Sequence, residues 1–297
     1  MKKNEKLPLR GALPKKRMQE RIFFVLAAFA LLVSLLTLFV LLIDTLHDGL
    51  PQLSWKFLTG YPSRKAEQAG IFPALVGSIY VTLLTVLFAI PIGVGTGIYL
   101  EEYAEKNRLS NTIEVSISTL SGVPSILYGM LGLELFARAL GFGRTIITGA
   151  LTLALLVLPI VIVTTRESIR AVPPSLREAA FALGATRWQV IKDHLLPVAF
   201  PGILTGVILT ISRAIGEAAP LIMVGALTYI AFLPRGITSP FTALPIQIFN
   251  WVSRPQKAFQ ANAAAGIIVL LALTLTLNSL AIFLRNRYQK RMSFRAF

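Results

Sequence analysis

Long apolar runs alternate with short polar segments along the whole chain, and this alternation predicts its elements. Six runs are each long enough to cross a hydrocarbon layer of about 30 Å, which takes about 20 helical residues. They cover residues 22–43, 71–99, 113–137, 145–164, 201–224 and 263–284. We therefore expect an all-α fold, a polytopic membrane helix bundle with six transmembrane helices.

The composition favours an integral membrane protein over a soluble one. Of the 297 residues, 55% are hydrophobic and only 14% are charged, whereas soluble domains carry roughly 25% charged residues. The net charge of +15 would also suit a nucleic-acid binder. However, the basic residues cluster beside apolar runs, which indicates membrane topology and no nucleic-acid partner. The chain has no cysteine, so disulfides and thiolate metal sites are excluded.

The distribution of Lys and Arg predicts the orientation. If the N-terminus is cytoplasmic, 20 of these 29 residues fall in inside segments and 8 in outside segments. Positive residues favour the inside, so we expect a multi-pass inner-membrane protein with both termini cytoplasmic. The first apolar run is longer than the ~7–15 residues of a signal peptide, so we expect it to be a retained helix in contact with membrane lipid.

Four regions follow from this topology. The expected order is a basic cytoplasmic tail (1–21), the first transmembrane helix with an outside loop (22–70), a core (71–284) and a basic cytoplasmic tail (285–297).

Residues 166–200 form the longest internal segment on the cytoplasmic side. After a pair of prolines, Ser175 and Glu178 have capping-box spacing, and Gly184 is a natural C-cap. A second short helix is expected to follow and to end by Pro197. The first helix carries an apolar stripe at helical spacing: Leu176, Ala179, Ala180 and Leu183. A helix lying along the membrane surface and a docking knob for a partner both fit this pattern.

The stretch EAAFALG, followed by LLP, resembles the "EAA" loop of ABC importer permeases. That pattern is Glu-Ala-Ala, three residues, Gly, nine residues, then Ile-x-Leu-Pro. The matching residues are Glu178, Ala179, Ala180, Gly184, Leu196 and Pro197. His194 stands where the pattern has Ile. The resemblance implies a type I ABC importer permease fold, with this loop as the coupling helix that docks on an ATPase subunit.

The chain contains no GxxxxGK[ST] phosphate loop. We therefore expect no enzymatic site and no cofactor on this chain, with ATP bound by a partner subunit.

Three further stretches resemble the A-type permease of phosphate-specific ABC importers. They are GVPSILYGMLGL (122–133), ISRAIGEAAPL (211–221) and FTALPIQIFNWVSRPQKAF (241–259). The resemblance covers roughly 71–284. It implies a companion permease, a dimeric ATP-binding subunit, an extracytoplasmic phosphate-binding protein and inorganic phosphate as cargo. Permeases for sulfate or molybdate share the scaffold, so another oxyanion is the alternative.

Arg213 and Glu217 interrupt the fifth apolar run. Arg213 lies about 18 Å into this run at ~1.5 Å per residue, where an ionisable side chain costs at least ~2.5–3.5 kcal/mol. Glu217 follows at i+4 and is expected on the same helix face, with Ser212 beside the pair. Either the two form an ion pair that ties helices together, or they line a substrate pathway.

The pathway interpretation has the stronger chemical reason. A guanidinium binds two phosphate oxygens bidentately, and Glu217 can take Arg213 back when the anion leaves. Arg before Glu is also the less favourable order for a local helix pair, and buried pairs often stabilise no better than apolar residues.

A rival interpretation is a lipid-modifying transferase that holds a lipid phosphate on Arg213 and uses Glu217 as a base. The sequence offers no second acid, nucleophile or metal cluster for it. The two histidines, His47 and His194, are expected on opposite sides of the membrane, so they cannot share a metal.

Several smaller features predict helix packing. Gly93, Gly95 and Gly97, which follow Pro91, indicate a kink in the second span and its close approach to a neighbour. The GxxxG of Gly202 and Gly206 is expected to pack on the companion permease. Asn278 is expected to bond a neighbouring helix. A separate pair, Glu134 and Arg138, is expected to form a rim ion pair.

Overall fold

The computed structural model describes residues 13–105, 107–226 and 229–293. The tail predicted for residues 1–21 therefore lies largely outside the described residues, as do the last four residues of the tail predicted for 285–297. Within the described ranges all regular structure is helical.

Five helices are long: α1 (Leu13–Gly49), α3 (Phe72–Ile98), α6 (Ile146–Arg170), α9 (Leu196–Gly216) and α12 (Ala258–Ser293). The shorter helices are α2 (Trp55–Thr59), α4 (Arg108–Leu120), α5 (Ser125–Gly132), α7 (Pro174–Ala182), α8 (Arg187–Gln189), α10 (Ala219–Met223) and α11 (Leu244–Val252). Two 3₁₀ turns, η1 (Leu50–Gln52) and η2 (Ala66–Gln68), and three π-helical segments, η3 (Tyr99–Tyr103), η4 (Leu133–Ala139) and η5 (Val190–Leu195), complete the described elements.

Five uninterrupted helical stretches of the described chain are long and apolar enough to cross a membrane. They contain α1, α3, α6, α9 and α12, as the apolar runs predict. A sixth span is present if α4 and the stretch from α5 to η4 cross together. The continuous third helix expected over 113–137 is wrong, because the chain bends by 104° between Leu120 and Ser125. Pro124 disfavours the α conformation in the residue before it, and this ends α4.

The fifth span differs from its prediction at both ends. The expected stop of the cytoplasmic helix at Pro197 is wrong, since α8, η5 and α9 run on without a break from Arg187 to Gly216. Pro197 directly follows the π-helical segment η5, so the regular α-helical hydrogen-bond pattern is already interrupted where Pro197 lacks its N–H. The expected helix over 201–224 also ends early, because Glu217 is extended and separates α9 from α10.

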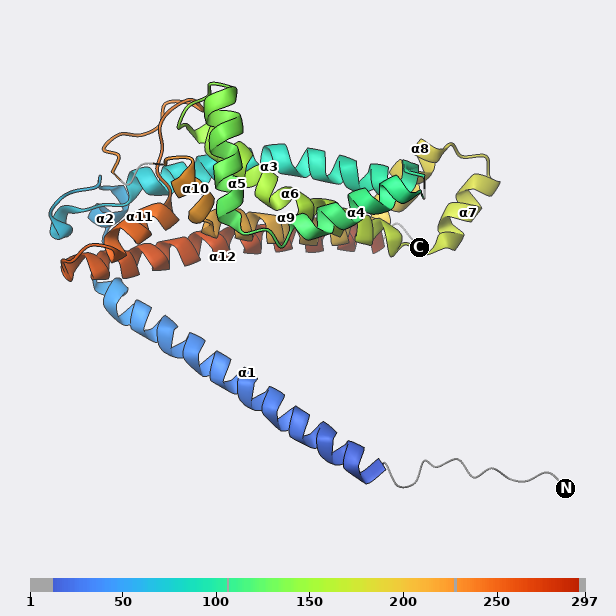
Figure 1. Cartoon of the computed structure of the whole chain (residues 1–297), viewed down its shortest axis with the longest axis horizontal. Coiled ribbons are helices and arrows are strands. Elements are labelled where there is room, and N and C mark those ends of the chain that lie inside the picture. The colour runs from blue at the N-terminus through green and yellow to red at the C-terminus, as the bar shows by residue number, and fades with distance from the viewer. Residues whose placement is uncertain (1–12, 106, 227–228, 294–297) are drawn as a thin grey trace.

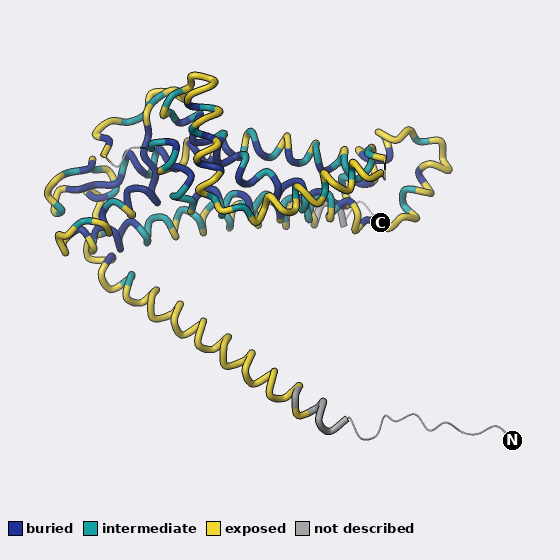
Figure 2. The backbone as a smooth tube through the Cα atoms, viewed as in Figure 1, coloured by how far each residue is buried: buried dark blue, intermediate teal, exposed yellow. Residues whose placement is uncertain are grey.

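The long helices of the bundle lie roughly parallel, and one helix stands apart. Figure 1 shows α3, α6, α9 and α12 along the long axis, with α7 and α8 at one end and α11 toward the other. Helix α1 diverges from this bundle and packs on the start of α12, where Gly49 approaches the backbone of Ala264. The apolar window of α1 is 0% buried (Figure 2). Its side chains therefore offer an apolar surface of the kind that lipid covers.

Glycines let three of the long helices approach one another closely. A Cβ on Gly93 would lie 2.7 Å from the Val161 Cβ, so α3 touches α6 there, as expected, whereas the close approach expected at Gly95 is wrong because no atom lies within 4 Å of its Cβ position. A Cβ on Gly206 would lie 2.7 Å from the Thr164 Cβ. The GxxxG motif of α9 therefore packs on α6 of its own chain, and the expectation that it meets the companion permease is wrong.

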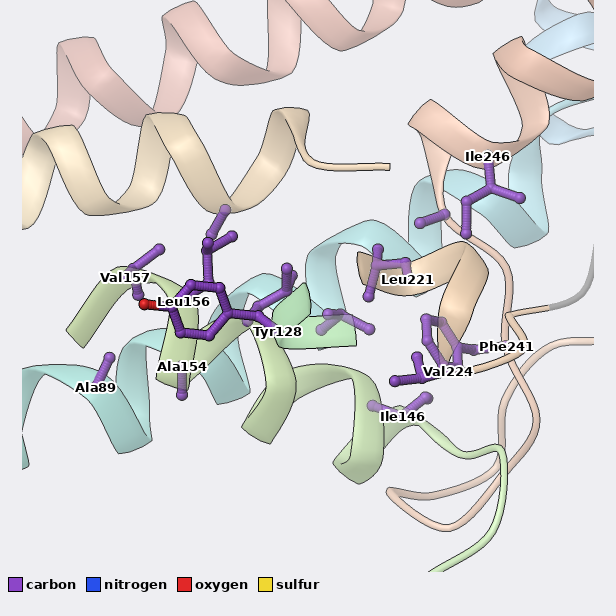
Figure 3. Close-up of a cluster of buried hydrophobic side chains, with 14 residues drawn as sticks. Ala89, Tyr128, Ile146, Ala154, Leu156, Val157, Leu221, Val224, Phe241 and Ile246 are labelled. Atoms are coloured by element: carbon purple, nitrogen blue, oxygen red, sulfur yellow. The ribbon is translucent and has the colours of Figure 1, made fainter. Parts of the chain in front are cut away.

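The largest buried cluster lies where α5, α6, α10 and the segment before α11 meet. Figure 3 shows Tyr128, Leu156, Leu221 and Phe241 among its side chains. Residues from the segment between the fifth and sixth apolar runs thus contribute to the core: Phe241, Leu244, Ile246 and Trp251 are almost fully buried. The loop that follows α10 is consequently fixed on the bundle.

Replacing Gly206 by alanine is expected to destabilise the bundle, because the new Cβ would push α9 away from α6. Overpacking of this kind costs typically about 1–3 kcal/mol. Gly95→Ala is the matched control, since no atom lies within 4 Å of its Cβ position and alanine favours a helix. The temperature at which the detergent-solubilised complex loses its single gel-filtration peak should fall only for Gly206→Ala. Equal temperatures for the two variants would contradict this account of the packing.

Candidate transport and coupling sites

The end of α9 forms a break in the fifth span. Helix α9 ends at Gly216, Glu217 has φ −79° and ψ 121°, and α10 begins only at Ala219. The last carbonyl groups of a helix lack partners within it. Gly216 is exposed, and no atom lies within 4 Å of the position that a Cβ would take there. The break is therefore open on one side.

Arg213 and Glu217 meet across this break. The Arg213 Nε lies 3.3 Å from the Glu217 Oε1, and the two side chains are 32% and 20% exposed. The pair therefore forms as expected, but the expected shared helix face is wrong, because Glu217 lies beyond the helix end. Arg213 is in the last turn of α9, where a cation is favoured by the partial negative charge of the free carbonyl groups. A partly exposed guanidinium held in this way can accept an anion as a second partner.

Ser212 contacts α12. Its Oγ lies 2.8 Å from the Asn278 Oδ1 and 2.9 Å from the carbonyl oxygen of Ile208. Asn278 thus bonds a neighbouring helix, as the sequence predicts. A contact between Ser212 and a passing anion would require this link between α9 and α12 to open.

The break in α9 lies close to the bend between α4 and α5. A Cβ on Gly129 would lie 2.7 Å from the Pro220 Cα, so α5 packs directly on α10. At the bend itself, the Tyr128 hydroxyl donates a hydrogen bond to the carbonyl oxygen of Leu120, at 2.8 Å. This bond satisfies one of the carbonyl groups at the end of α4. The two interruptions of the membrane helices therefore share one region of the molecule.

The coupling segment begins differently from its prediction. Helix α7 starts at Pro174, its N-cap is Pro173, and neither position has a side-chain cap. The expected capping box of Ser175 and Glu178 is therefore wrong, since Pro174 itself favours the first helical turn. The structure places a capping box instead at the start of α8, between Thr186 and Gln189.

The end of α7 confirms the glycine cap. Gly184 has φ +80°, its N–H bonds the carbonyl oxygen of Phe181 at 2.9 Å, and the N–H of Ala185 bonds that of Ala180 at 3.1 Å. This is a Schellman motif, in which glycine takes the left-handed conformation without strain. The motif fixes the angle between α7 and α8.

The residues of the EAA pattern face different directions. Glu178, Ala179 and Gly184 are exposed, and Glu178 has no hydrogen-bond or ion-pair partner within the described chain. Ala180 is buried in the cluster that packs α7 on its own chain. Leu196 and Pro197 are half-buried behind the knob, in the first turn of α9.

The tip of this segment is apolar and uncovered. The expected apolar stripe is only partly right, because Leu176 and Ala180 pack inward whereas Leu183 is 89% exposed. Phe181 and Trp188 are also exposed. Large apolar side chains gathered on a protruding segment are typical of a protein interface. Exposed Leu, Phe and Trp side chains suit a protein partner and a membrane surface alike.

Ion pairs that the sequence analysis missed hold α7 against the rest of the chain. Arg177 of α7 reaches the Glu102 carboxylate at 2.8 Å and the carbonyl oxygen of Ile169 at 3.0 Å. Next to it, Arg166 binds Glu101 at 2.9 Å and also pairs with Glu114.

Arg187 completes these contacts, lying over the ring of Tyr103 with 5.5 Å to its centre. The adjacent acids in LEEY, opposite a basic loop, are the sequence signal that could have indicated the pairing.

Other candidate residues carry no further site. Glu134 and Arg138 form the expected exposed ion pair. His47 contacts Asp48 at 3.1 Å and His194 is exposed in η5. Among the described residues, no group of three or more His, Cys, Asp and Glu could hold a metal ion.

Comparison with known proteins agrees with this architecture. The family described as binding-protein-dependent transport system inner membrane component matches residues 89–294. The chain is 37% identical over 244 residues to the probable ABC transporter permease protein YqgI of Bacillus subtilis (strain 168), covering 77% of this chain and 83% of that protein. It is 34% identical over 277 residues to the phosphate transport system permease protein PstA of Yersinia pestis, covering 92% of each.

A solved structure has the same fold. One chain of a bacterial ABC transporter involved in the import of the acidic polysaccharide alginate gives a TM-score of 0.64 at 15% identity, covering 93% of this chain and 98% of that one. This likeness confirms the expected type I ABC importer permease fold. Fold, family match and relatives together show that the chain belongs to the binding-protein-dependent transport system inner membrane components, as a multi-pass permease subunit of an ABC importer.

Proposed function

We propose that this permease carries inorganic phosphate and that Arg213 and Glu217 lie on its path. The observation that carries the proposal is the open break of α9, where a partly exposed guanidinium and a carboxylate meet at 3.3 Å. Non-helical backbone at membrane depth is tolerated where it is buried in protein or lines a cavity with water. A cation at such a break suits an anionic substrate. The phosphate transport permease of Yersinia pestis, a relative over 92% of this chain, supports phosphate.

The pair would bind the anion without trapping it. Arg213 supplies a fork that matches two phosphate oxygens. Glu217 competes for the same guanidinium and replaces the anion when it leaves, so that binding stays weak enough for release. Sulfate and molybdate would satisfy the same cation, and discrimination between oxyanions therefore has to come from Glu217 or its neighbours.

The remaining partners follow from the fold and the relatives. A companion permease would complete the pathway, and an extracytoplasmic phosphate-binding protein would deliver the anion. A dimeric ATP-binding subunit would dock on α7 and supply the ATP site. The first residues of α1 and the last of α12 lie toward the same end as α7 in Figure 1, which fits cytoplasmic termini.

Replacing Arg213 by glutamine is expected to lower uptake of labelled phosphate at least tenfold, because no cation would remain at the break of α9. Arg213→Lys should retain an intermediate rate, since the charge stays but the bidentate fork is lost. Arg235→Gln is the control, because it removes an exposed cation from the loop between α10 and α11. Normal uptake by a correctly inserted Arg213→Gln complex would overturn the proposal.

Glu217→Gln is expected to reduce the preference for phosphate over sulfate. At neutral pH phosphate keeps a hydroxyl group that can donate a hydrogen bond to a carboxylate. Sulfate is fully deprotonated and has no such donor. A loss of about 1.4 kcal/mol corresponds to a tenfold change in the ratio of the two inhibition constants, measured against labelled phosphate uptake. An unchanged ratio would leave Glu217 as a counter-ion only.

Leu183→Asp is expected to reduce at least tenfold the amount of ATPase subunit that co-purifies with the permease. The substitution places a charge on the exposed apolar tip beside Gly184. Val252→Asp provides the control, since Val252 is also an exposed apolar residue but lies on α11, near the opposite end of the bundle. Equal recovery of the ATPase subunit with both variants would show that the tip is not its docking surface.

A further inference from the structure

Helix α4 carries a polar face that the described chain leaves uncovered. Asn111 and Ser118 are exposed, and Glu114 between them is half-buried. These residues follow at i, i+3 and i+7 and so share one side of the helix. Leu109, Ile113 and Leu120 occupy the other side and are 68%, 40% and 45% exposed. A helix of this kind separates an apolar environment from a polar one.

The polar face is unsuited to lipid. The side chains of Asn111 and Ser118 have no hydrogen-bond partner within the described part of the chain. Leaving such groups unsatisfied in an apolar medium costs several kcal/mol each in the least favourable case, so they require water or polar partners. If α4 and the stretch from α5 to η4 cross the membrane together, the polar face of α4 requires a place in the membrane region that is not hydrocarbon.

Hollows in the surface lie on this same side. An open groove of about 650 Å³ is lined by Asn111, Glu114, Val115, Ser118 and Thr119. A smaller cavity of about 180 Å³ shares Asn111 and Glu114 with this groove and is bounded by Glu101, Arg166 and Arg170 among others. The polar face of α4 therefore borders a shallow open groove and one more enclosed cavity.

Glu114 is the one charged residue that lines the groove, and it is paired. It pairs with Arg166, which also binds Glu101 at 2.9 Å, and Arg170 binds Glu101 at 3.1 Å and Glu167 at 3.5 Å, so carboxylates outnumber arginines in the cluster behind the groove. The carboxylate of Glu114 is thereby neutralised, so that it repels an approaching anion little. An amide, a hydroxyl and a neutralised ion pair bind an oxyanion weakly, as a conduit requires.

The two ends of α4 connect the proposed anion site with the α7 end of the bundle. Leu120, the last residue of α4, accepts a hydrogen bond from the Tyr128 hydroxyl. Gly129, which follows Tyr128, touches Pro220 just beyond the break of α9. The first residues of α4 follow η3, which binds α7 through Glu102 and Arg177. In Figure 1, α4 runs from the bend toward α7 and α8.

We propose that the polar face of α4 lines the inner half of the translocation path, along which an inorganic oxyanion moves from Arg213 toward the cytoplasm. The proposal deepens the proposed function and rests on it. It assigns Asn111 and Ser118 as lining residues and gives Arg166 the role of neutralising Glu114, the one carboxylate that lines the groove.

Cysteine labelling tests the proposal cleanly, because the native chain has no cysteine. Ser118→Cys and the matched control Ile113→Cys are made singly in the complete complex and studied in inside-out vesicles. An anionic, membrane-impermeant methanethiosulfonate reagent should modify Ser118→Cys at least tenfold faster than Ile113→Cys. The attached sulfonate should then block transport only in the Ser118→Cys complex, measured as ATP-driven release of labelled phosphate from the same inside-out vesicles.

Each outcome decides the matter. Equal or absent labelling of Ser118→Cys would show that lipid or the companion permease covers this face, and fast labelling without a block would show a water-filled crevice off the path. Either result overturns the proposal while the effect of Arg213→Gln on uptake still stands. Conversely, if Arg213→Gln transports normally but Ser118→Cys labels and blocks, the path along α4 remains and the role of Arg213 is lost.

Discussion

Backbone groups that leave a helix inside a membrane must find other partners, and this constraint organises the whole molecule. The structure interrupts two membrane helices, after Leu120 and after Gly216. The first interruption is closed by the Tyr128 hydroxyl, and the second lies beside the charged pair of Arg213 and Glu217. Both are compatible with a bilayer only because they face protein or a polar space. The same constraint therefore explains why polar side chains collect at this depth.

Hydrophobicity alone predicted most of the scaffold. Apolar runs locate membrane helices well, since a crossing needs about 20 apolar residues whatever their order. They cannot reveal a break in a run whose residues stay apolar. Gly216 and Pro220 were the only signs that α9 ends before α10 begins, and both residues also occur within membrane helices. Conversely, Pro197 predicted the end of a helix, but the structure continues in helical form past this residue.

Chemistry that depends on distant residues was harder to predict. The pair of Arg213 and Glu217 is local in sequence, so its contact was foreseen. The pairing of Arg177 with Glu102 spans 75 positions and depends on how α7 folds back on η3. The left-handed Gly184 was predictable because few other residues adopt that conformation, whereas the side of α7 that faces outward required the packing of Ala180 to be known.

The glycine contacts determine which parts of the subunit can move together. Gly93 packs α3 against Val161 of α6 and Gly206 packs α9 against Thr164 of α6, so only one side chain separates the backbones at each contact. Arg177 joins α7 to η3, which follows α3, and to the end of α6. A displacement of α7 is therefore expected to move α3, α6 and α9 together, whereas α1, which packs on the start of α12, is expected to follow less.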